Sequence, residues 1–143
     1  MTMLVDAIGR RTSDPDLIWE PEWTSVCTHQ FNLLVEGTSP ATERLVTLLA
    51  PHLRGPVVRR AAQQPFDLPT ACGSLLLTDV SKLSDRGQAA LLAWLDGRAQ
   101  RTQVISTTAR RLFPLVARGR FAADLYYRLN TVVLTLDSSG AAA

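Results

Sequence analysis

The feature that most constrains the fold is a segment near the middle of the chain that contains three consecutive leucines. It reads Ser74-Leu75-Leu76-Leu77-Thr78-Asp79-Val80. A strand with one face in water alternates apolar and polar residues, whereas a strand of a parallel sheet that is covered on both faces is apolar throughout. We therefore expect residues 74–80 to form an inner strand of a parallel sheet.

Further strands and helices are expected on both sides of this run. Short apolar runs bounded by turn residues predict strands at residues 31–36, 57–58, 103–107 and 131–136. Helices are predicted at residues 41–53, 84–96, 112–117 and 122–129, with Ser84 as the N-cap of the second. Strands that alternate with helices are typical of an α/β domain. The expected architecture is a three-layer sandwich with a central parallel sheet of about five strands.

Composition places the chain among ordinary globular domains. It has 143 residues, 46% of them hydrophobic, and a net charge of +2. This charge is too small to indicate a nucleic-acid-binding protein, so DNA binding is not expected. A signal peptide and a membrane span are not expected either, which favours the cytoplasm. The predicted organisation is a helical or peripheral segment at 1–30, a core at 31–137 and a disordered tail at 138–143.

The last third of the core carries a motif. Residues 119–130 read G-R-F-x-x-D-L-Y-Y-R-L-N. This run resembles the arginine-finger segment of the sigma-54 activators, the bacterial enhancer-binding branch of the AAA+ ATPases. Residues 73–80 resemble the strand G-T-L-F-L-D-E-I of that family, and residues 104–110 resemble its V-I-A-A-T-N-R. The resemblance implies a P-loop NTPase or AAA+ core, which we expect to lack the helical lid of the family.

The segment that would bind phosphate departs from the family pattern. Residues 36–46 read E-G-T-S-P-A-T-E-R-L-V, against E-G-E-S-G-T-G-K-E-L-V in the family. Gly37 and Ser39 are retained, but Pro40 and Thr42 stand where glycines belong. Glu43 replaces the lysine that would neutralise phosphate charge, and Arg44, one residue later, is the candidate to compensate. We expect a degenerate site at which ATP and magnesium binding is doubtful.

The other catalytic positions implied by the resemblance are altered as well. Thr78 takes the place of the magnesium-binding aspartate, Asp79 that of the catalytic glutamate, and Ala109 that of the sensor asparagine. Arg128 corresponds to the second arginine finger, which would act on the nucleotide of a neighbouring subunit. An equally weighted alternative is a structural salt bridge from Arg128 to a residue such as Asp124. No metal site is expected, since Cys27 and His29 lack a second ligand pair.

The sequence leaves two hypotheses about function. The loops with which the family engages sigma-54 are shortened here, between residues 58 and 66 and between residues 95 and 104. The favoured hypothesis is therefore a catalytically inactive AAA+ domain that regulates transcription through protein contacts. Its partner would be another copy of the chain or an active sigma-54 activator. The alternative is a residual ATP-binding protein or weak ATPase that uses Arg44, Asp79 and Arg128.

Overall fold

The computed structural model describes residues 2–5, 31–62, 67–70, 72–97 and 102–136. Its elements follow one another in the order β1 (Thr2–Val5), β2 (Leu33–Glu36), α3 (Ser39–Leu49), the short 3₁₀ helix η1 (Ala50–His52), β3 (Val57–Ala61), β4 (Ser74–Thr78), the 3₁₀ helix η2 (Val80–Lys82), α4 (Asp85–Gly97), β5 (Gln103–Thr108), α5 (Leu112–Ala117), α6 (Ala123–Leu129) and β6 (Val132–Leu136).

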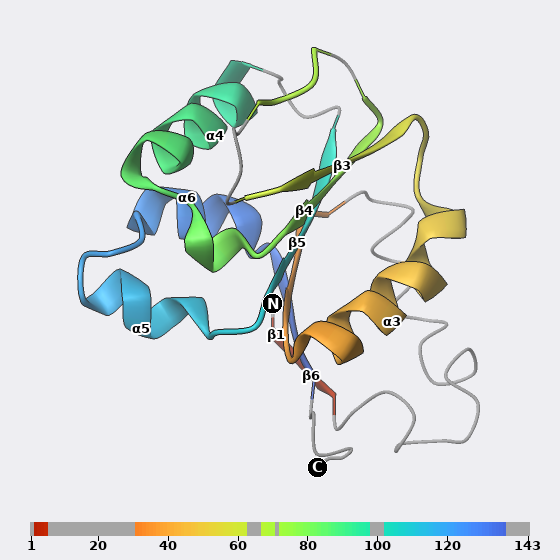
Figure 1. The fold of residues 1–143 in the computed structure, drawn as a ribbon, viewed down its shortest axis with the longest axis horizontal. Coiled ribbons are helices and arrows are strands. Elements are labelled where there is room, and N and C mark those ends of the chain that lie inside the picture. Colours follow the sequence, from red (N-terminus) through yellow and green to blue (C-terminus); the bar gives the residue numbers. More distant parts are fainter. Residues whose placement is uncertain (1, 6–30, 63–66, 71, 98–101, 137–143) are drawn as a thin grey trace.

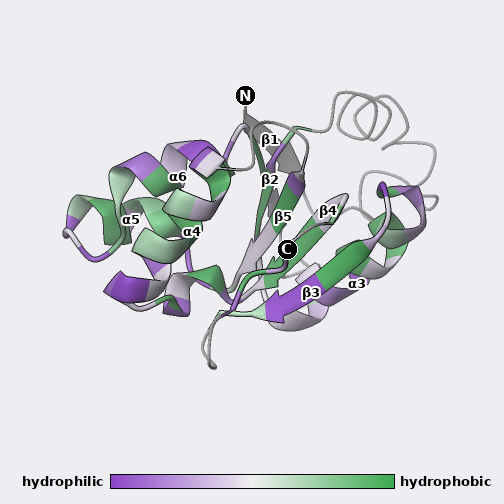
Figure 2. Ribbon diagram, turned by 90° about the horizontal axis from the view of Figure 1, so that it is seen from above, coloured by the Kyte–Doolittle hydropathy of each residue, from purple (hydrophilic) through white to green (hydrophobic). Residues whose placement is uncertain are grey.

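The strands form one parallel sheet with the order β1-β6-β2-β5-β4-β3. Helix α3 covers one face of this sheet, and α4, α5 and α6 cover the other (Figure 1). Figure 2 shows the same three layers from above, with the strands between the two helical layers. The expected α/β sandwich is confirmed.

The apolar strands are explained by two separate cores. On β2, Leu34 packs in the cluster beneath α4, α5 and α6, while Leu33 and Val35 pack in the cluster beneath α3. Leu75 and Leu77 of β4 belong to the first cluster and Leu76 to the second. Since successive side chains point to opposite faces, both faces of these strands need apolar residues.

Helix α4 begins where the sequence predicts. The backbone N–H of Gly87 donates to Ser84 Oγ over 3.0 Å, which satisfies one of the free amides at the helix start. The helix ends at Gly97. Ser84 is therefore confirmed as the N-cap of this helix.

The N-terminal residues differ from the expectation. Residues 2–5 were predicted to be peripheral, but they form β1, which pairs in parallel with β6 from Thr2 opposite Val133 to Val5 opposite Leu136. The sheet consequently has six strands rather than about five. A four-residue edge strand gives almost no periodic signal, because its place depends on a partner strand at the far end of the sequence. The rest of the 1–30 segment, with Cys27 and His29, lies outside the described residues, as does the tail at 138–143.

Membrane-spanning helices and metal-ligand clusters are both absent from the described part of the chain. None of their helices has the length and apolar character needed to cross a membrane. Among the same residues, no group of three or more histidine, cysteine, aspartate or glutamate side chains could hold a metal ion.

Candidate nucleotide site

The positions that would bind nucleotide gather at one edge of the sheet. Gly37, Asp79 and Ala109 directly follow the carboxyl ends of β2, β4 and β5, which are neighbouring strands of the sheet. Open parallel sheets bind ligands at this edge. The fold therefore brings together most of the residues that the sequence selected, and their side chains decide what the edge can do.

Gly37 is fixed by contacts within the domain. Its N–H donates to the carbonyl of Thr108 over 3.0 Å, so this amide extends the pairing of β2 with β5. A Cβ atom at residue 37 would lie 2.9 Å from Cβ of Leu136, closer than side chains normally approach. The glycine is thus required by packing between β2 and β6, whether or not a phosphate is present.

The start of α3 offers fewer donors than a phosphate loop. The helix begins at Ser39 with Pro40 in its first turn, and Pro40 has no N–H to donate. Thr42, at a position where the family has glycine, is buried, and its Oγ1 donates to the carbonyl of Ser39 over 3.1 Å. A working loop surrounds phosphates with backbone N–H groups from flexible glycines. Here the backbone is helical and one of its amides is missing.

Glu43 is paired with a cation on the neighbouring strand. Its carboxylate forms an ion pair with the guanidinium of Arg59 in β3, and both side chains are about half exposed, at 48% and 49%. Arg44 is exposed at the next position of α3. The carboxylate at the lysine position is therefore held by Arg59. The sequence alone did not predict this ion pair.

The end of β4 has an unusual backbone. Asp79 adopts a left-handed conformation, with φ of 57° and ψ of 46°, and its carbonyl accepts the N–H of Lys82, the last residue of η2. Thr78 Oγ1 lies 3.5 Å from the carbonyl of Arg60, toward β3. Aspartate tolerates left-handed geometry better than most residues. The described contacts of Thr78 and Asp79 thus belong to the turn and to the pairing with β3.

The sensor position lies in a tight turn organised by its neighbour. Thr108 Oγ1 accepts the N–H of Arg110 over 3.1 Å and donates to the carbonyl of Arg110 over 2.6 Å. Ala109, between them, is exposed and carries a methyl group that forms no hydrogen bond. The turn therefore holds its shape without a polar side chain at residue 109.

Arg128 lies away from this edge. It is near the C-terminus of α6, and its carbonyl accepts the side-chain N–H of Asn32, which precedes β2, over 2.8 Å. Asn32 stands at the amino end of the sheet, opposite to the edge that carries Gly37 and Asp79. Arg128 therefore cannot act with those residues within one chain.

The partner of Arg128 differs from the one suggested by the sequence. Its guanidinium forms an ion pair with Asp96 of α4, not with Asp124. Position 124 is one turn earlier on the same helix, but α4 and α6 pack against each other and bring Asp96 close. Arg128 thus forms an ion pair with Asp96 instead of Asp124, and its role toward a neighbouring subunit stays a prediction.

Glu36 is a buried acid that the sequence did not single out as important. One carboxylate oxygen accepts the N–H of Leu112 at the start of α5 over 3.2 Å, and the other accepts the hydroxyl of Thr135 over 3.3 Å. Ser106 of β5 is also buried, and its hydroxyl has no hydrogen-bond partner among the described residues. For Glu36, the available signal was a charged residue at the end of the otherwise apolar strand β2.

Comparison with known proteins identifies the family. A model of the family described as "Sigma-54 interaction domain" matches residues 51–138, which is more than half of the chain. The chain belongs to the sigma-54 interaction domain family. The matched part contains the segments around Asp79, Ala109 and Arg128, and it leaves residues 36–46 outside.

Curated relatives agree with this family. The HTH-type transcriptional regulatory protein TyrR of Salmonella typhimurium is 41% identical over 75 residues, covering 45% of this chain and 15% of its own length. The Nif-specific regulatory protein of Rhizobium leguminosarum is 37% identical over 93 residues, covering 57% of this chain and 17% of its own. The chain thus spans less than a fifth of the length of these transcription regulators.

Solved structures support the fold. NtrX from Brucella abortus superposes with a TM-score of 0.66 at 21% identity, over 87% of this chain and 37% of its own. The P-loop NTPase domain of a sigma-54 activator from E. coli gives a TM-score of 0.58 at 20% identity, over 82% of this chain and 94% of that domain. At these identities the likeness establishes the P-loop NTPase or AAA+ architecture.

Proposed function

We propose that this sigma-54 interaction domain is catalytically inactive and acts in transcription regulation through protein contacts in the cytoplasm. The observation that carries the proposal is Glu43, which occupies the lysine position of the phosphate loop and is paired with Arg59. An acid at this position repels a triphosphate where the lysine would attract it.

The magnitude of this reversal is about half the binding free energy of a micromolar ligand, which is about 8 kcal/mol. One charge pair at 4 Å and an effective dielectric constant of 20 is worth roughly 4 kcal/mol before screening by salt. Arg59 offsets part of the repulsion, since its positive charge lies beside Glu43, but it is already engaged there. The residues at the start of α3 do not fit a magnesium–ATP complex.

Other contacts point the same way. Pro40 removes an amide from the first turn of α3, and the Gly37 amide donates to Thr108 within the domain. Ala109 has no side-chain group with which to sense a γ-phosphate. Binding and hydrolysis would both be lost, since independent parts of the site are altered.

We infer a protein partner from the parts of the fold that are retained, namely the sheet and its two apolar cores. The sheet and both apolar cores are complete enough to form a stable scaffold, although the chemistry of its edge has changed. The partner proposed is the AAA+ ring of an active sigma-54 activator, with association between copies of this chain as the competing outcome. In such a ring the domain would supply a subunit surface without a functional nucleotide site.

The partner is tested by size-exclusion chromatography with light scattering. The purified chain is run alone and then mixed with the AAA+ module of each sigma-54 activator from the same organism, with and without ATP. We expect a mixed complex with at least one activator and an altered ATPase rate of that activator. Failure to associate with any of them, or a stable homo-oligomer that excludes them, would contradict this form of the proposal.

A further inference from the structure

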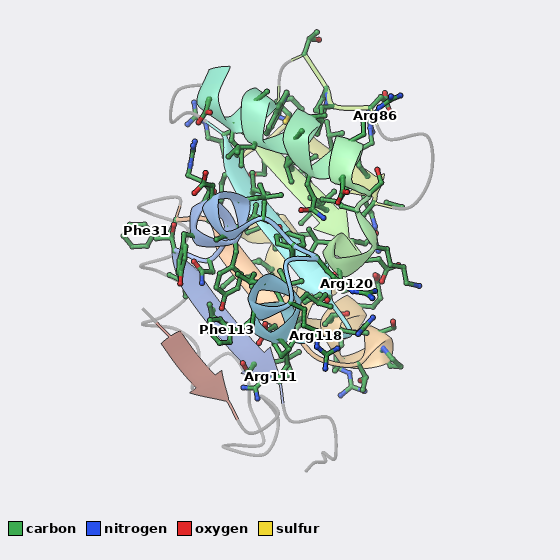
Figure 3. All side chains as sticks on the ribbon, turned by 90° about the vertical axis from the view of Figure 1, so that its left-hand side faces the viewer. Phe31, Arg86, Arg111, Phe113, Arg118 and Arg120 are labelled. Atoms are coloured by element: carbon green, nitrogen blue, oxygen red, sulfur yellow. The ribbon has the colours of Figure 1, made fainter. Side chains whose placement is uncertain are left out.

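Arginines are concentrated around the short helix α5. Residues 109–123 contain four arginines and no acidic residue: Arg110, Arg111, Arg118 and Arg120. All four side chains are exposed. Figure 3 shows Arg111, Arg118 and Arg120 together with Phe113 around α5 on the face toward the viewer. We call these four arginines and Phe113 the α5 face.

Three of these four arginines have no carboxylate partner among the described residues. Among the described residues, no carboxylate lies within ion-pair distance of Arg110, Arg118 or Arg120. Arg111 Nε is 4.0 Å from Glu36 Oε1, and its side chain is 73% exposed. By contrast, Arg59, Arg60 and Arg128 pair with Glu43, Asp67 and Asp96. The positive charge of the α5 face is therefore available to a partner.

A cavity opens beside Arg111 and Phe113 of the α5 face. It has a volume of about 330 Å³ and is lined by Glu36, Arg111, Phe113, Pro114, Tyr126, Asn130, Val133 and Thr135. Its aromatic walls are in contact, with the rings of Phe113 and Tyr126 6.2 Å apart between centroids. Burial raises the pKa of the Tyr126 hydroxyl. The cavity is large enough for one side chain of a partner.

The exposed aromatic rings favour an apolar occupant. Phe113 is 56% exposed and Tyr127 is 63% exposed, while Tyr126 lies between them with its ring 5.1 Å from that of Tyr127. The Glu36 carboxylate in the cavity disfavours a second anion there. A partner side chain in the cavity would thus be uncharged, and its acidic neighbours would lie outside, on the arginines.

The composition of the α5 face distinguishes a protein from a nucleic acid. Arginine and aromatic residues are enriched in the energetically important centres of protein interfaces. Guanidinium groups also match carboxylates through two parallel hydrogen bonds. A duplex would need phosphate contacts along a longer positive surface, and the net charge of +2 is small for that purpose. Charge complementarity therefore selects an acidic protein segment.

We propose that the α5 face binds an acidic segment of a partner protein, with an aromatic or aliphatic side chain in the cavity between α5 and α6. Carboxylates of the segment would pair with Arg110, Arg118 and Arg120. This inference rests on the proposed function, because it names the surface and the partner chemistry for a domain that acts through protein contacts.

Fluorescence anisotropy with defined peptides tests the inference. The probe is a fluorescein-labelled 12-residue peptide of glutamate and aspartate around one central tryptophan. Matched peptides replace the acids by glutamine, or the tryptophan by alanine, and a 12-base-pair DNA duplex is the fourth probe. We expect salt-sensitive binding of the acidic tryptophan peptide, with at least tenfold weaker binding of the glutamine peptide.

Variants locate the surface. Arg118→Glu/Arg120→Glu is expected to weaken binding of the acidic peptide at least tenfold. Arg44→Glu/Arg86→Glu reverses two exposed arginines, on α3 and on α4, and is the charge-matched control, which should bind like the wild type. Phe113→Ala should reduce the preference for tryptophan over alanine. Thermal unfolding of each variant verifies the fold, which these exposed positions should not disturb.

Three results would overturn the inference. They are an absence of peptide binding up to 1 mM, equal binding by the wild type and by Arg118→Glu/Arg120→Glu, and tighter binding of the duplex than of the acidic peptide. None of these depends on nucleotide, so they leave the proposed catalytic inactivity standing. Conversely, measurable ATP binding would contradict the proposed function without changing the peptide result.

Discussion

Glu43 in α3 forms an ion pair with Arg59 in β3, at the position where a phosphate loop carries its lysine. The two residues come from α3 and β3, which follow each other in the chain with only η1 between them. A lysine at position 43 would meet Arg59 with a like charge. The arginine is therefore matched to the acid and poorly matched to the residue that nucleotide binding needs.

The ion pair should contribute modestly to stability. In a double-mutant cycle of Glu43→Gln and Arg59→Gln, we expect a coupling free energy of about 0.2–1 kcal/mol, because both groups are about half exposed. Urea unfolding of the four proteins measures it. The coupling should shrink in 1 M NaCl, since salt screens exposed pairs. A coupling that is absent at low salt would mean that the pair does not persist in solution.

Gly37 should be required for packing. Gly37→Ala places a Cβ atom against Leu136, and overpacking of this kind costs about 1–3 kcal/mol of unfolding free energy. Gly97→Ala is the matched control, because a Cβ atom there meets nothing within 4 Å, and a helical alanine is at least as stable as glycine. Chemical denaturation of both variants decides the question. Equal effects at residues 37 and 97 would refute the packing requirement.

The buried Ser106 hydroxyl should lower the stability of the fold. It is buried without a hydrogen-bond partner in the described part of the chain, so Ser106→Ala is expected to raise the unfolding free energy by up to about 1 kcal/mol. Thr108→Val is the contrasting variant, since it removes a hydroxyl that bonds Arg110 and should lower stability by about 1 kcal/mol. A loss of stability in Ser106→Ala would show that the hydroxyl has a partner in solution.

Asp79 should carry backbone strain. A left-handed conformation costs a residue with a Cβ atom about 1–2 kcal/mol, and glycine avoids this cost. Glycine also has a more flexible unfolded chain, so Asp79→Gly is expected to raise the unfolding free energy by at most about 1 kcal/mol. Asp79→Val should lower it by at least about 1 kcal/mol, because branched residues avoid this region. Similar losses for both variants would indicate that the carboxylate itself stabilises the turn.

Much of the sheet could be predicted because its signal is local. Within residues 74–80, three consecutive positions are leucine because Leu76 faces α3 while Leu75 and Leu77 face the other helical layer. Strand β1 was missed for the opposite reason. It is four residues long, and it is defined by hydrogen bonds to β6 at the other end of the described chain.

The altered positions of the site could also be identified, because each replaces a residue of a recognisable motif. The side chains that pair with these residues in the fold could not be identified from the sequence. Glu43 and Arg59 are 16 residues apart in sequence, and Arg128 and Asp96 are 32 apart. Such pairs depend on how α3 lies against β3 and how α6 packs on α4. The same limit hid Glu36, whose contacts come from α5 and β6.

The most direct test of the account is isothermal titration of the whole chain with magnesium and ATP. The AAA+ module of an active sigma-54 activator, titrated under the same conditions, is the positive control. We predict no saturable heat for this chain at nucleotide concentrations up to several millimolar, because Glu43 and Pro40 occupy the start of α3. Saturable, magnesium-dependent ATP binding with a dissociation constant below 1 mM would contradict the account.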